Sequence, residues 1–462
     1  MTLVNGIFDH DPVEVCNVVG SSRGIARMRP VTKIWPRNLN TFVVTTITIA
    51  APIPLASNHP LAWLFWASII GVMGAITTAA RPTNPGMDTQ VKYLFLLGFT
   101  LLGWAIFQTL PLPGLRGGIS VNLPSGPVAF RYLSIAPGAT FLAAIRLTSY
   151  LIFFWLALQL SRQPTRAKRV GYFIFYGVTV HAVFAIIALF LFNDINFISE
   201  KNAYHSMATG TFVNKNSFAT FLGMGMVLGL ALTLNEPAPI QSRKPELVRI
   251  IRLLCLTIIL ITLLLTQSRM GIAASLTAAV YILHRAMPFA RLRPGLIIFF
   301  LLFASALFAF GLNNPFFHFT RSGETRFALY QQVVQLIASR PITGFGIDSF
   351  SLAFQQFHAP GVTAEFVWDK AHSTYLTLWS ESGVFFGSIP IIAGAIATRQ
   401  LWFRSRIRRP GQSLALAGFG ASLLVAIHSL MDFSLEIQAN TFLFLVIIAL
   451  GLGPEHTPKG KS

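Results

Sequence analysis

Charged residues are scarce in this sequence of 462 residues, of which Asp, Glu, Lys and Arg make up 11%. A soluble domain carries about 25% charged residues, so most of this chain does not need contact with water. Hydrophobic residues make up 53%, including 41 Phe. They recur in apolar blocks of about 20 residues, the length of a helix that spans a bilayer. Blocks of about ten residues with strict alternation, typical of a membrane β-barrel, are absent. The composition therefore predicts an all-α polytopic membrane protein.

Cysteine and cofactor motifs are also sparse. The two cysteines, Cys16 and Cys255, give neither a metal-ligand spacing nor an expected disulfide. Residues 1–38 lack the apolar core of a signal peptide, so we expect the N-terminal segment to be retained. No P-loop, zinc motif or nucleophile elbow is present, and residues 344–346 (GFG) lack the third glycine of a dinucleotide-binding loop and predict a turn. We therefore expect no cofactor and no metal.

The apolar blocks predict about twelve transmembrane helices. The expected spans are 39–57, 61–80, 93–110, 139–160, 171–193, 217–234, 250–267, 270–284, 295–312, 375–398, 412–431 and 440–453.

The positions of Lys and Arg predict the orientation of these helices. Of the 35 basic residues, 25 fall in every second loop and in the terminal segments, together with seven of the 16 acids. That side carries a formal charge of +18 and the other side +1, so we expect both termini to be cytoplasmic. Topology thus accounts for the net charge of +19. A basic soluble protein would suggest nucleic acid, but here we exclude nucleic acid as a partner.

With this orientation the chain divides into five parts. They are a cytoplasmic N-terminal segment (1–38), helices one to nine (39–312), an extracytoplasmic loop with part of an active site (313–374), helices ten to twelve (375–453) and a cytoplasmic tail (454–462).

Two outer loops carry local signals. In the long loop, apolar residues spaced by three and four positions predict a helix at 323–339 that lies along the membrane surface, with Ser322 as its cap and Pro341 just after its end. Residues 111–138 are rich in Pro and Gly, so we expect this loop to be irregular.

Two arginines stand out on the outer side. Arg269 lies in the tight turn between the seventh and eighth helices, where a charge costs several kcal/mol unless it is paired or hydrated. It either snorkels to the interface or binds phosphate through the two arms of its guanidinium. Arg326 is predicted in the first turn of the surface helix, where the helix dipole disfavours a cation. Either a bound anion or an ion pair with Glu324 would relieve that conflict.

His372 lies just before the tenth helix. Histidine is the side chain that gains and loses a proton near neutral pH. Beside two arginines it would tend to stay neutral, and a neutral imidazole can accept a proton from a sugar hydroxyl. The simpler alternative is an interfacial histidine that donates a structural hydrogen bond.

Further polar residues converge on the same side. Asn214 and Asn216 precede the sixth helix, and Arg146, about two turns into the fourth, either reaches the same anion or snorkels. His428 and Asp432, spaced i and i+4, share a helix face and either orient a substrate or tie the eleventh helix to a neighbour.

Glu381 differs from these candidates because it lies inside a predicted helix and not at its outer end. It lies nine residues beyond His372, about 13.5 Å deeper on a helix and on the opposite face. It would not be a direct partner of His372 unless the helix breaks near Gly383. A buried carboxylate needs a partner, so a structural hydrogen bond is the alternative to substrate binding.

Together these motifs resemble the O-antigen ligase and polymerase superfamily of bacterial envelope glycosyltransferases. The matching stretches, in order, are residues 210–216 (GTFVNKN), 268–271 (SRMG), 325–326 (TR), 341–346 (PITGFG), 372–376 (HSTYL), 381–383 (ESG) and 428–433 (HSLMDF). Residues 111–113 (PLP) and 134–137 (SIAP) resemble polymerase-like members. One departure is Ser373, where many members have Asn.

The resemblance implies about twelve transmembrane helices with a large periplasmic loop in the bacterial inner membrane. It implies an inverting, metal-independent transfer of glycan from undecaprenyl diphosphate to a sugar hydroxyl of a glycan or of lipid A-core. Arg269 and Arg326 would hold the diphosphate, and His372 would be the base or would orient the acceptor. The further candidate substrate-binding residues, argued above from their positions, are Asn214, Asn216, Arg146, His428, Asp432 and Glu381. Other polysaccharide assembly proteins are candidate partners.

Within this family, the similarity at 111–137 and 428–433 favours a polysaccharide polymerase over a lipid A-core O-antigen ligase. The competing function is a transporter or flippase for a glycolipid or a small anion. A transporter places its ionisable residues near the bilayer midplane on broken helices, whereas this sequence places them at the outer rim.

Overall fold

The computed structural model describes residues 35–453, apart from 81–87, 113–119, 124–125, 130–131, 193, 196–199, 202, 237–243, 287–318, 364, 366 and 408–409. The predicted ninth helix (295–312) and nearly all of both predicted cytoplasmic termini lie outside the described residues.

The described elements are α1 (Trp35–Ala50), η2 (Leu55–Ser57), α2 (Pro60–Ala80), α3 (Thr89–Gln108), β1 (Ser120–Leu123), β2 (Gly126–Ala129), α4 (Pro137–Ser161), α5 (Pro164–Phe190), α6 (Lys215–Asn235), α7 (Pro245–Leu265), α8 (Arg269–Ala286), α10 (Phe319–Ser339), α11 (Phe350–Phe354), α12 (Thr374–Gly387), α13 (Ile389–Arg406), α14 (Gln412–His428), η3 (Ser434–Glu436) and α15 (Gln438–Gly451).

Helix α6 forms the centre of the bundle, in contact with α5, α7, α8, α14 and α15. It is apolar on every side, as expected of a helix enclosed by others. Its glycines allow close approach: a Cβ at Gly223 would lie 2.1 Å from Ser275 Oγ, and one at Gly229 would lie 2.2 Å from the ring of Phe175. The Asn214 side chain caps the helix by accepting from the backbone N–H of Asn216 and Ser217.

The structure is that of an all-α polytopic membrane protein, as the composition predicts. In the part of the chain that the structure describes, six helices are long and apolar enough to cross a membrane, or seven if α12 and α13 form one span. Three further apolar helices are shorter, namely residues 38–50, α14 and α15. The predicted number of about twelve spans is not confirmed.

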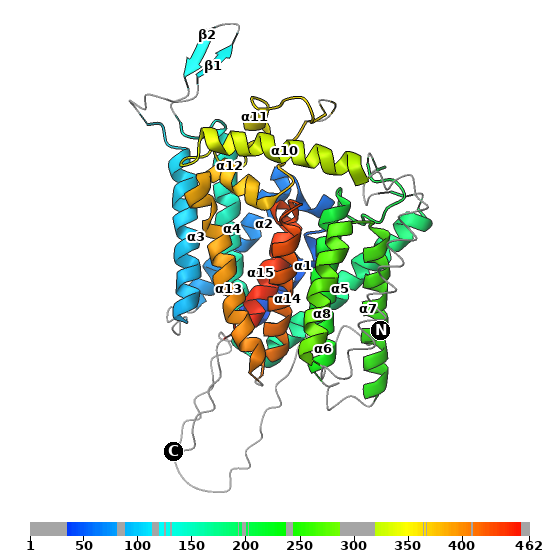
Figure 1. The fold of residues 1–462 in the computed structure, drawn as a ribbon. Coiled ribbons are helices and arrows are strands. Elements are labelled where there is room, and N and C mark those ends of the chain that lie inside the picture. The colour runs from blue at the N-terminus through cyan, green and yellow to red at the C-terminus, as the bar shows by residue number, and fades with distance from the viewer. Residues whose placement is uncertain are drawn as a thin grey trace, which may run out of the picture.

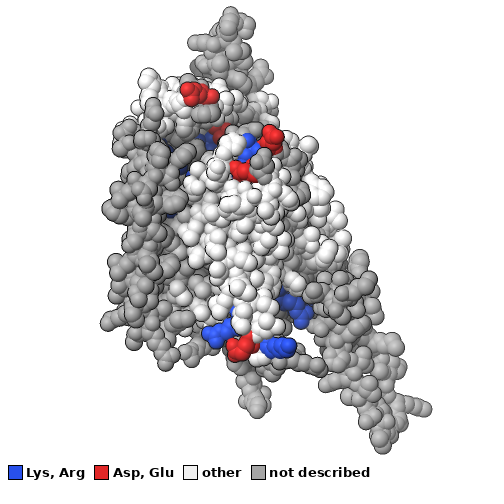
Figure 2. Space-filling view, turned by 90° about the vertical axis from the view of Figure 1, so that its right-hand side faces the viewer, with Lys and Arg blue, Asp and Glu red and all other residues white. Residues whose placement is uncertain are grey.

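Helix α10 lies across one end of the bundle, and the hairpin of β1 and β2 projects beyond the same end (Figure 1). We call this the α10 end. There Leu329 and Val333 on the apolar face of α10 pack with residues of α11 and the segments around it, such as Phe345, Phe350 and Ala371, to form a small second core. On the face that Figure 2 shows, charged side chains gather near the two ends of the bundle and other residues fill the band between them.

Several local predictions need correction. The tenth span, predicted as continuous over 375–398, is divided into α12 and α13, which form an angle of 76°. Helix α12 is itself interrupted at Gly383, where the backbone is not helical. The surface helix begins at Phe319 instead of residue 323, so Ser322 lies inside it and is not its cap. The loop predicted to be irregular contains the β1–β2 hairpin, and the long loop has a second short helix, α11.

Candidate functional site

The nine predicted site residues are all described. Seven of them fall into two groups at the α10 end, and the other two, Asn214 and Asn216, hold the turn beside the first group. Six residues form what we call the histidine site: Lys215, Arg269, Arg326, His372, His428 and Asp432. Five form what we call the ion network: Arg146, Asp348, Lys370, Glu381 and Glu436. Four of these eleven residues, namely Lys215, Asp348, Lys370 and Glu436, were not predicted as site residues.

His372 is half-buried in the segment that leads into α12. Its ring packs between Trp368 and Phe433, with centroids 5.4 and 5.2 Å away. Its carbonyl accepts a 2.9 Å hydrogen bond from Tyr330 Oη of α10. The backbone is left-handed at His372 (φ 53°), a conformation that costs a non-glycine residue about 1–3 kcal/mol. The surrounding contacts therefore hold the imidazole in a defined place.

Burial lowers the pKa of His372 below its ordinary value, and the charge of Arg326 lowers it further. The carboxylates Asp432 and Asp369 oppose this shift. The prediction of a neutral imidazole rested on two arginines, but the larger cause is burial. The imidazole is therefore ready to accept a proton at neutral pH, and Asp432 would stabilise the imidazolium that forms. The Nδ1 atom of His372 is buried and, within the described residues, has no hydrogen-bond partner.

Arg326 is the cation at the middle of the histidine site. Its charge acts on His372, on His428 and on Lys215. Because α10 begins at Phe319, Arg326 lies beyond the first turn, and the predicted conflict with the helix dipole does not hold. The side chain of Glu324, its predicted alternative partner, lies outside the described residues.

Two further cations come from the tight turn before α8 and from the start of α6. Arg269 is exposed at the first residue of α8. Lys215 donates to the carbonyl of Gln267 at 3.2 Å, and the charges of both Arg269 and Arg326 act on it. Three cations from α6, α8 and α10 therefore converge, an arrangement that attracts a multivalent anion such as a diphosphate.

The two predicted asparagines hold this turn together. Asn214 is the N-cap of α6, with its Oδ1 2.7 Å from the N–H of Asn216. The Oδ1 of Asn216 accepts from Ser268 Oγ at 2.8 Å, which ties the start of α6 to the residue before Arg269. Lys215, between the two asparagines, was overlooked in the sequence because it was counted only as one of the few basic residues on the outer side.

His428 and Asp432 are both 1% exposed, but they do not share a helix face as predicted, because α14 ends at His428. His428 Nδ1 lies 2.5 Å from Thr220 Oγ1 of α6. Asp432 Oδ2 accepts a hydrogen bond from Ser434. The other polar atoms, His428 Nε2 and Asp432 Oδ1, are buried with no hydrogen-bond partner among the residues that the structure describes. Buried polar atoms are normally bonded, so these two are suited to contact a polar ligand.

The ion network contains the other two predicted residues. Arg146 lies 3.9 Å from Asp348 Oδ1 and packs over the ring of Trp63 at 4.2 Å. Glu381 Oε1 accepts from the backbone N–H of Phe350 at 3.2 Å. The structure thus gives Arg146 and Glu381 protein partners away from the three converging cations.

Lys370 is the centre of the ion network. Its Nζ lies 3.1 Å from Glu436 Oε2 and 3.7 Å from Asp348 Oδ1. Burial would lower the pKa of Lys370, but Glu436, Asp348 and Glu381 together raise it above its ordinary value. Burial raises the pKa of Glu436, and Lys370 counteracts this. Each side chain therefore depends on its partner to remain charged.

The break in α12 is built against the turn at residues 341–346. Gly346 N donates to Glu381 O at 2.9 Å, and Val384 N donates to Pro341 O at 2.7 Å. Gln108 of α3 closes the junction by donating to Thr343 O and Glu381 O at 2.9 and 3.0 Å. The PITGFG and ESG motifs therefore have a structural role here: they join the long loop to the broken helix.

Replacing Gly344 by alanine is expected to destabilise this junction. Gly344 has a φ of +64°, and an added Cβ would lie 2.4 Å from the backbone of Glu381. Overpacking of this kind costs about 1–3 kcal/mol. Gly411→Ala is the matched control, since Gly411 also has a positive φ (+95°) but no atom within 4 Å of an added Cβ. Thermal unfolding of the purified protein should show a lower Tm for Gly344→Ala than for Gly411→Ala; equal values would contradict the close contact.

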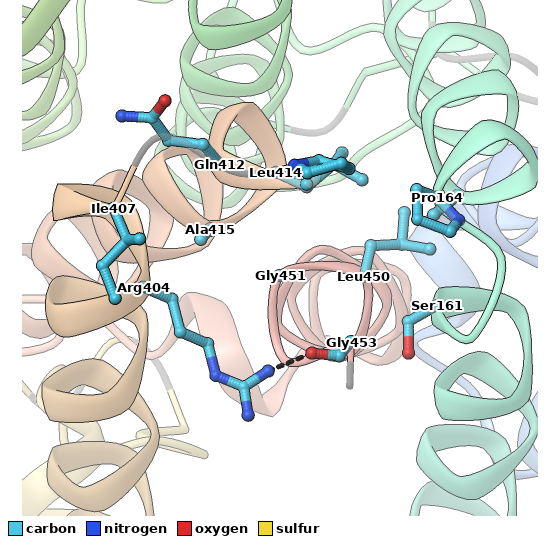
Figure 3. Close-up of a pocket in the computed structure, with 13 residues that line it drawn as sticks. Ser161, Pro164, Arg404, Ile407, Gln412, Leu414, Ala415, Leu450, Gly451 and Gly453 are labelled. Carbon is cyan, nitrogen blue, oxygen red and sulfur yellow. Dashed lines mark hydrogen bonds between the residues drawn. The ribbon is translucent and has the colours of Figure 1, made fainter. Parts of the chain in front are cut away.

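A small cavity lies at the opposite end of the bundle, between α13, α14, α15 and the junction of α4 with α5 (Figure 3). Arg404 borders it and donates to the carbonyl of Gly453 and to Asp88 Oδ2. No residue of the histidine site or of the ion network lines this cavity, so it is separate from the candidate site.

Comparison with known proteins supports the family. Residues 254–391 match the family model described as O-antigen ligase. The matched region includes Arg269, Arg326 and His372, and also Asp348, Lys370 and Glu381. A search of curated proteins found no match. The match confirms the resemblance to the O-antigen ligase and polymerase superfamily, and at the level of the family it indicates a membrane-embedded glycosyltransferase that acts on lipid-linked glycan.

Proposed function

Since the chain carries an O-antigen ligase segment at residues 254–391, we propose that it is an inverting, metal-independent glycosyltransferase. It transfers glycan from undecaprenyl diphosphate to a sugar hydroxyl at the periplasmic face of the bacterial inner membrane. The observation that carries this proposal is the convergence of Lys215, Arg269 and Arg326, together with the action of Arg326 on His372.

The three cations suit the leaving group of this reaction. When the bond between the anomeric carbon and the diphosphate oxygen breaks, the electron pair stays on the diphosphate and its negative charge grows. Guanidinium groups stabilise such charge with paired hydrogen bonds and cannot lose their own. Arg269 and Arg326 therefore lower the barrier by stabilising charge that develops in the transition state.

His372 suits the acceptor side. As the acceptor hydroxyl attacks the anomeric carbon from the face opposite the diphosphate, a glycosidic bond forms and the configuration inverts. The hydroxyl proton passes to the neutral imidazole, which becomes imidazolium. Asp432, whose charge acts on His372, stabilises that cation. Asp432 Oδ1 and His428 Nε2, which have no hydrogen-bond partner among the described residues, are the candidate hydrogen-bond groups for the acceptor sugar.

The site residues lie at the α10 end, and this placement favours an enzyme over a transporter or flippase. A transporter holds its substrate between broken helices at the midplane of the bilayer. Here the broken helix, α12, lies beneath α10 (Figure 1), and its break packs on the turn at 341–346. The interruption in α12 is therefore hydrogen-bonded to the turn at 341–346, at the α10 end of the bundle.

We propose that the α10 end faces the periplasm and that both termini are cytoplasmic. The sequence assigns 25 of the 35 basic residues to the loops and termini of the side opposite His372, and loops rich in Lys and Arg stay in the cytoplasm. After Cys16 and Cys255 are replaced by serine, Gln356→Cys should react with a membrane-impermeant maleimide added to spheroplasts, and Arg406→Cys should react only after lysis. Both positions are exposed, so access depends on the side of the membrane. Labelling of Arg406→Cys alone in intact spheroplasts would overturn this orientation.

We favour a polysaccharide polymerase over a lipid A-core ligase, on the sequence similarity at 111–137 and 428–433. Deletion of the gene followed by analysis of the envelope glycans tests this choice. A polymerase deletion loses all long polymer and keeps single repeats on their acceptor. A ligase deletion instead accumulates unattached polymer on the lipid carrier, which would contradict the polymerase.

A further inference from the structure

Lys370 lies two residues before His372, but its side chain belongs to the ion network. It is 15% exposed, and its Nζ contacts Glu436 of η3 and Asp348 of the turn after α10. Asp348 in turn lies 3.9 Å from Arg146 of α4. Through these pairs the segment that carries His372 is attached both to the helical bundle and to the loop beneath α10.

The chain is also fixed on the other side of His372. Ser373 Oγ donates to Ser429 O at 3.2 Å, and Thr374 N lies 3.1 Å from both Ser429 O and Asp432 O. Between the two anchors, Ala371 is fully buried and His372 has its left-handed backbone. A strained backbone persists only where the surroundings hold it, so both anchors are needed to keep the imidazole near Arg326 and Asp432.

We propose that Lys370 is a positioning residue for His372, acting through its ion pair with Glu436. Lys370 contacts neither donor nor acceptor; it fixes the backbone on which the imidazole is mounted. The proposal rests on the proposed function, because it takes His372 as the base that receives the acceptor proton.

The charges of the network make the role of Lys370 testable. Two cations, Lys370 and Arg146, face three carboxyl groups, Asp348, Glu381 and Glu436. Lys370→Met leaves one cation facing three carboxyl groups, and unpaired buried charge is strongly destabilising. Lys370→Met combined with Glu436→Gln leaves one cation facing two carboxyl groups, which restores the original difference of one but not the ion pair. The double variant therefore separates the loss of the anchor from the effect of unpaired charge.

The test compares these variants in a glycan-transfer assay with the purified, reconstituted full-length chain. Lys370→Met should lower kcat by about 10²-fold, the order of loss expected when a catalytic group is misplaced by about 1 Å. The KM for the lipid-linked donor should change less than about twofold, because no binding group is removed. Lys370→Arg, which keeps a cation for the ion pair, should recover most of kcat. The double variant should lose about as much kcat as Lys370→Met, because both lack the ion pair that anchors the backbone. Lys168→Met, which breaks a part-buried ion pair with Glu236 at the other end of the bundle, should have normal kcat.

A second readout does not depend on transfer. Amide hydrogen exchange of residues 371–376 should be faster in Lys370→Met and in the double variant than in wild type, and normal in Lys168→Met. Unchanged exchange, a wild-type kcat, or a raised KM with normal kcat in Lys370→Met would each overturn the proposal. So would a double variant that recovers kcat, because charge imbalance and not the lost anchor would then explain the single variant. If the wild-type chain transfers no glycan, the proposed function fails, whereas the exchange experiment still decides whether Lys370 positions His372.

Discussion

His372→Ala is expected to lower the rate of glycan transfer by about 10²–10⁴-fold, the usual contribution of a positioned general base. The variant removes the group that takes the acceptor proton and leaves the three cations in place. Donor binding should therefore remain close to that of wild type, and the loss should appear in kcat. The measurement is single-turnover transfer in proteoliposomes, with donor binding measured separately. Normal transfer by His372→Ala would remove His372 from the mechanism.

The dependence of transfer on pH gives a second test of His372. A base works when it is deprotonated, so the rate should fall as the pH drops through the pKa of His372 and should level off above it. Because burial and Arg326 lower this pKa, the midpoint of the acid limb should lie below about 6.5, the ordinary value for histidine. His372→Gln should show no such limb. A limb that persists in this variant would assign the titration to another group.

Arg326→Ala is expected to lower kcat/KM for the lipid-linked donor by about 10²–10³-fold, comparable to the loss of a donor that stabilises an oxyanion. Arg326 is the cation whose charge acts on His372, His428 and Lys215, so its loss weakens the whole histidine site. Arg326→Lys keeps the charge but not the paired N–H groups, and should recover activity only in part. Arg399→Ala, on α13, removes a cation outside the histidine site and should be neutral.

The same assay measures whether Arg269 and Arg326 bind one anion. If both hold the diphosphate, Arg269→Ala and Arg326→Ala should each impair transfer, and the double variant should lose less than the product of the single losses. Strictly multiplicative losses would indicate two independent roles and would contradict a shared diphosphate site.

The sequence predicted the membrane fold because composition and block length report burial in lipid directly. It also predicted the residues that converge, since Arg269, Arg326 and His372 are unusual for the side of the membrane on which they were placed. Errors arose where a residue's setting depends on where a helix begins or ends. Arg326 lies beyond the first turn of α10, and Asp432 lies past the end of α14. A shift of a few residues in a helix boundary was enough to remove the predicted dipole conflict of Arg326 and the predicted shared helix face of His428 and Asp432.

The ion network could not be predicted from local patterns. Lys370, Asp348 and Glu436 come from separate segments, and each was counted only as a charge on the outer side. Their pairing depends on how the turn after α10, the segment before α12 and η3 fold against α4. The interruption at Gly383 could not be predicted for the same reason. It is stabilised by the turn at 341–346, which supplies backbone hydrogen-bond partners from a distant part of the sequence. Contacts of this range leave no periodicity for a sequence argument to use.

The most direct test of the account is the fate of the lipid carrier. Purified wild-type protein would be reconstituted in liposomes with undecaprenyl-diphosphate-linked oligosaccharide and a glycan acceptor. We predict that each new glycosidic bond releases one undecaprenyl diphosphate, and that His372→Ala and Arg326→Ala release almost none. Movement of intact lipid-linked oligosaccharide across the bilayer, with no glycosidic bond formed, would contradict the enzyme and support a flippase.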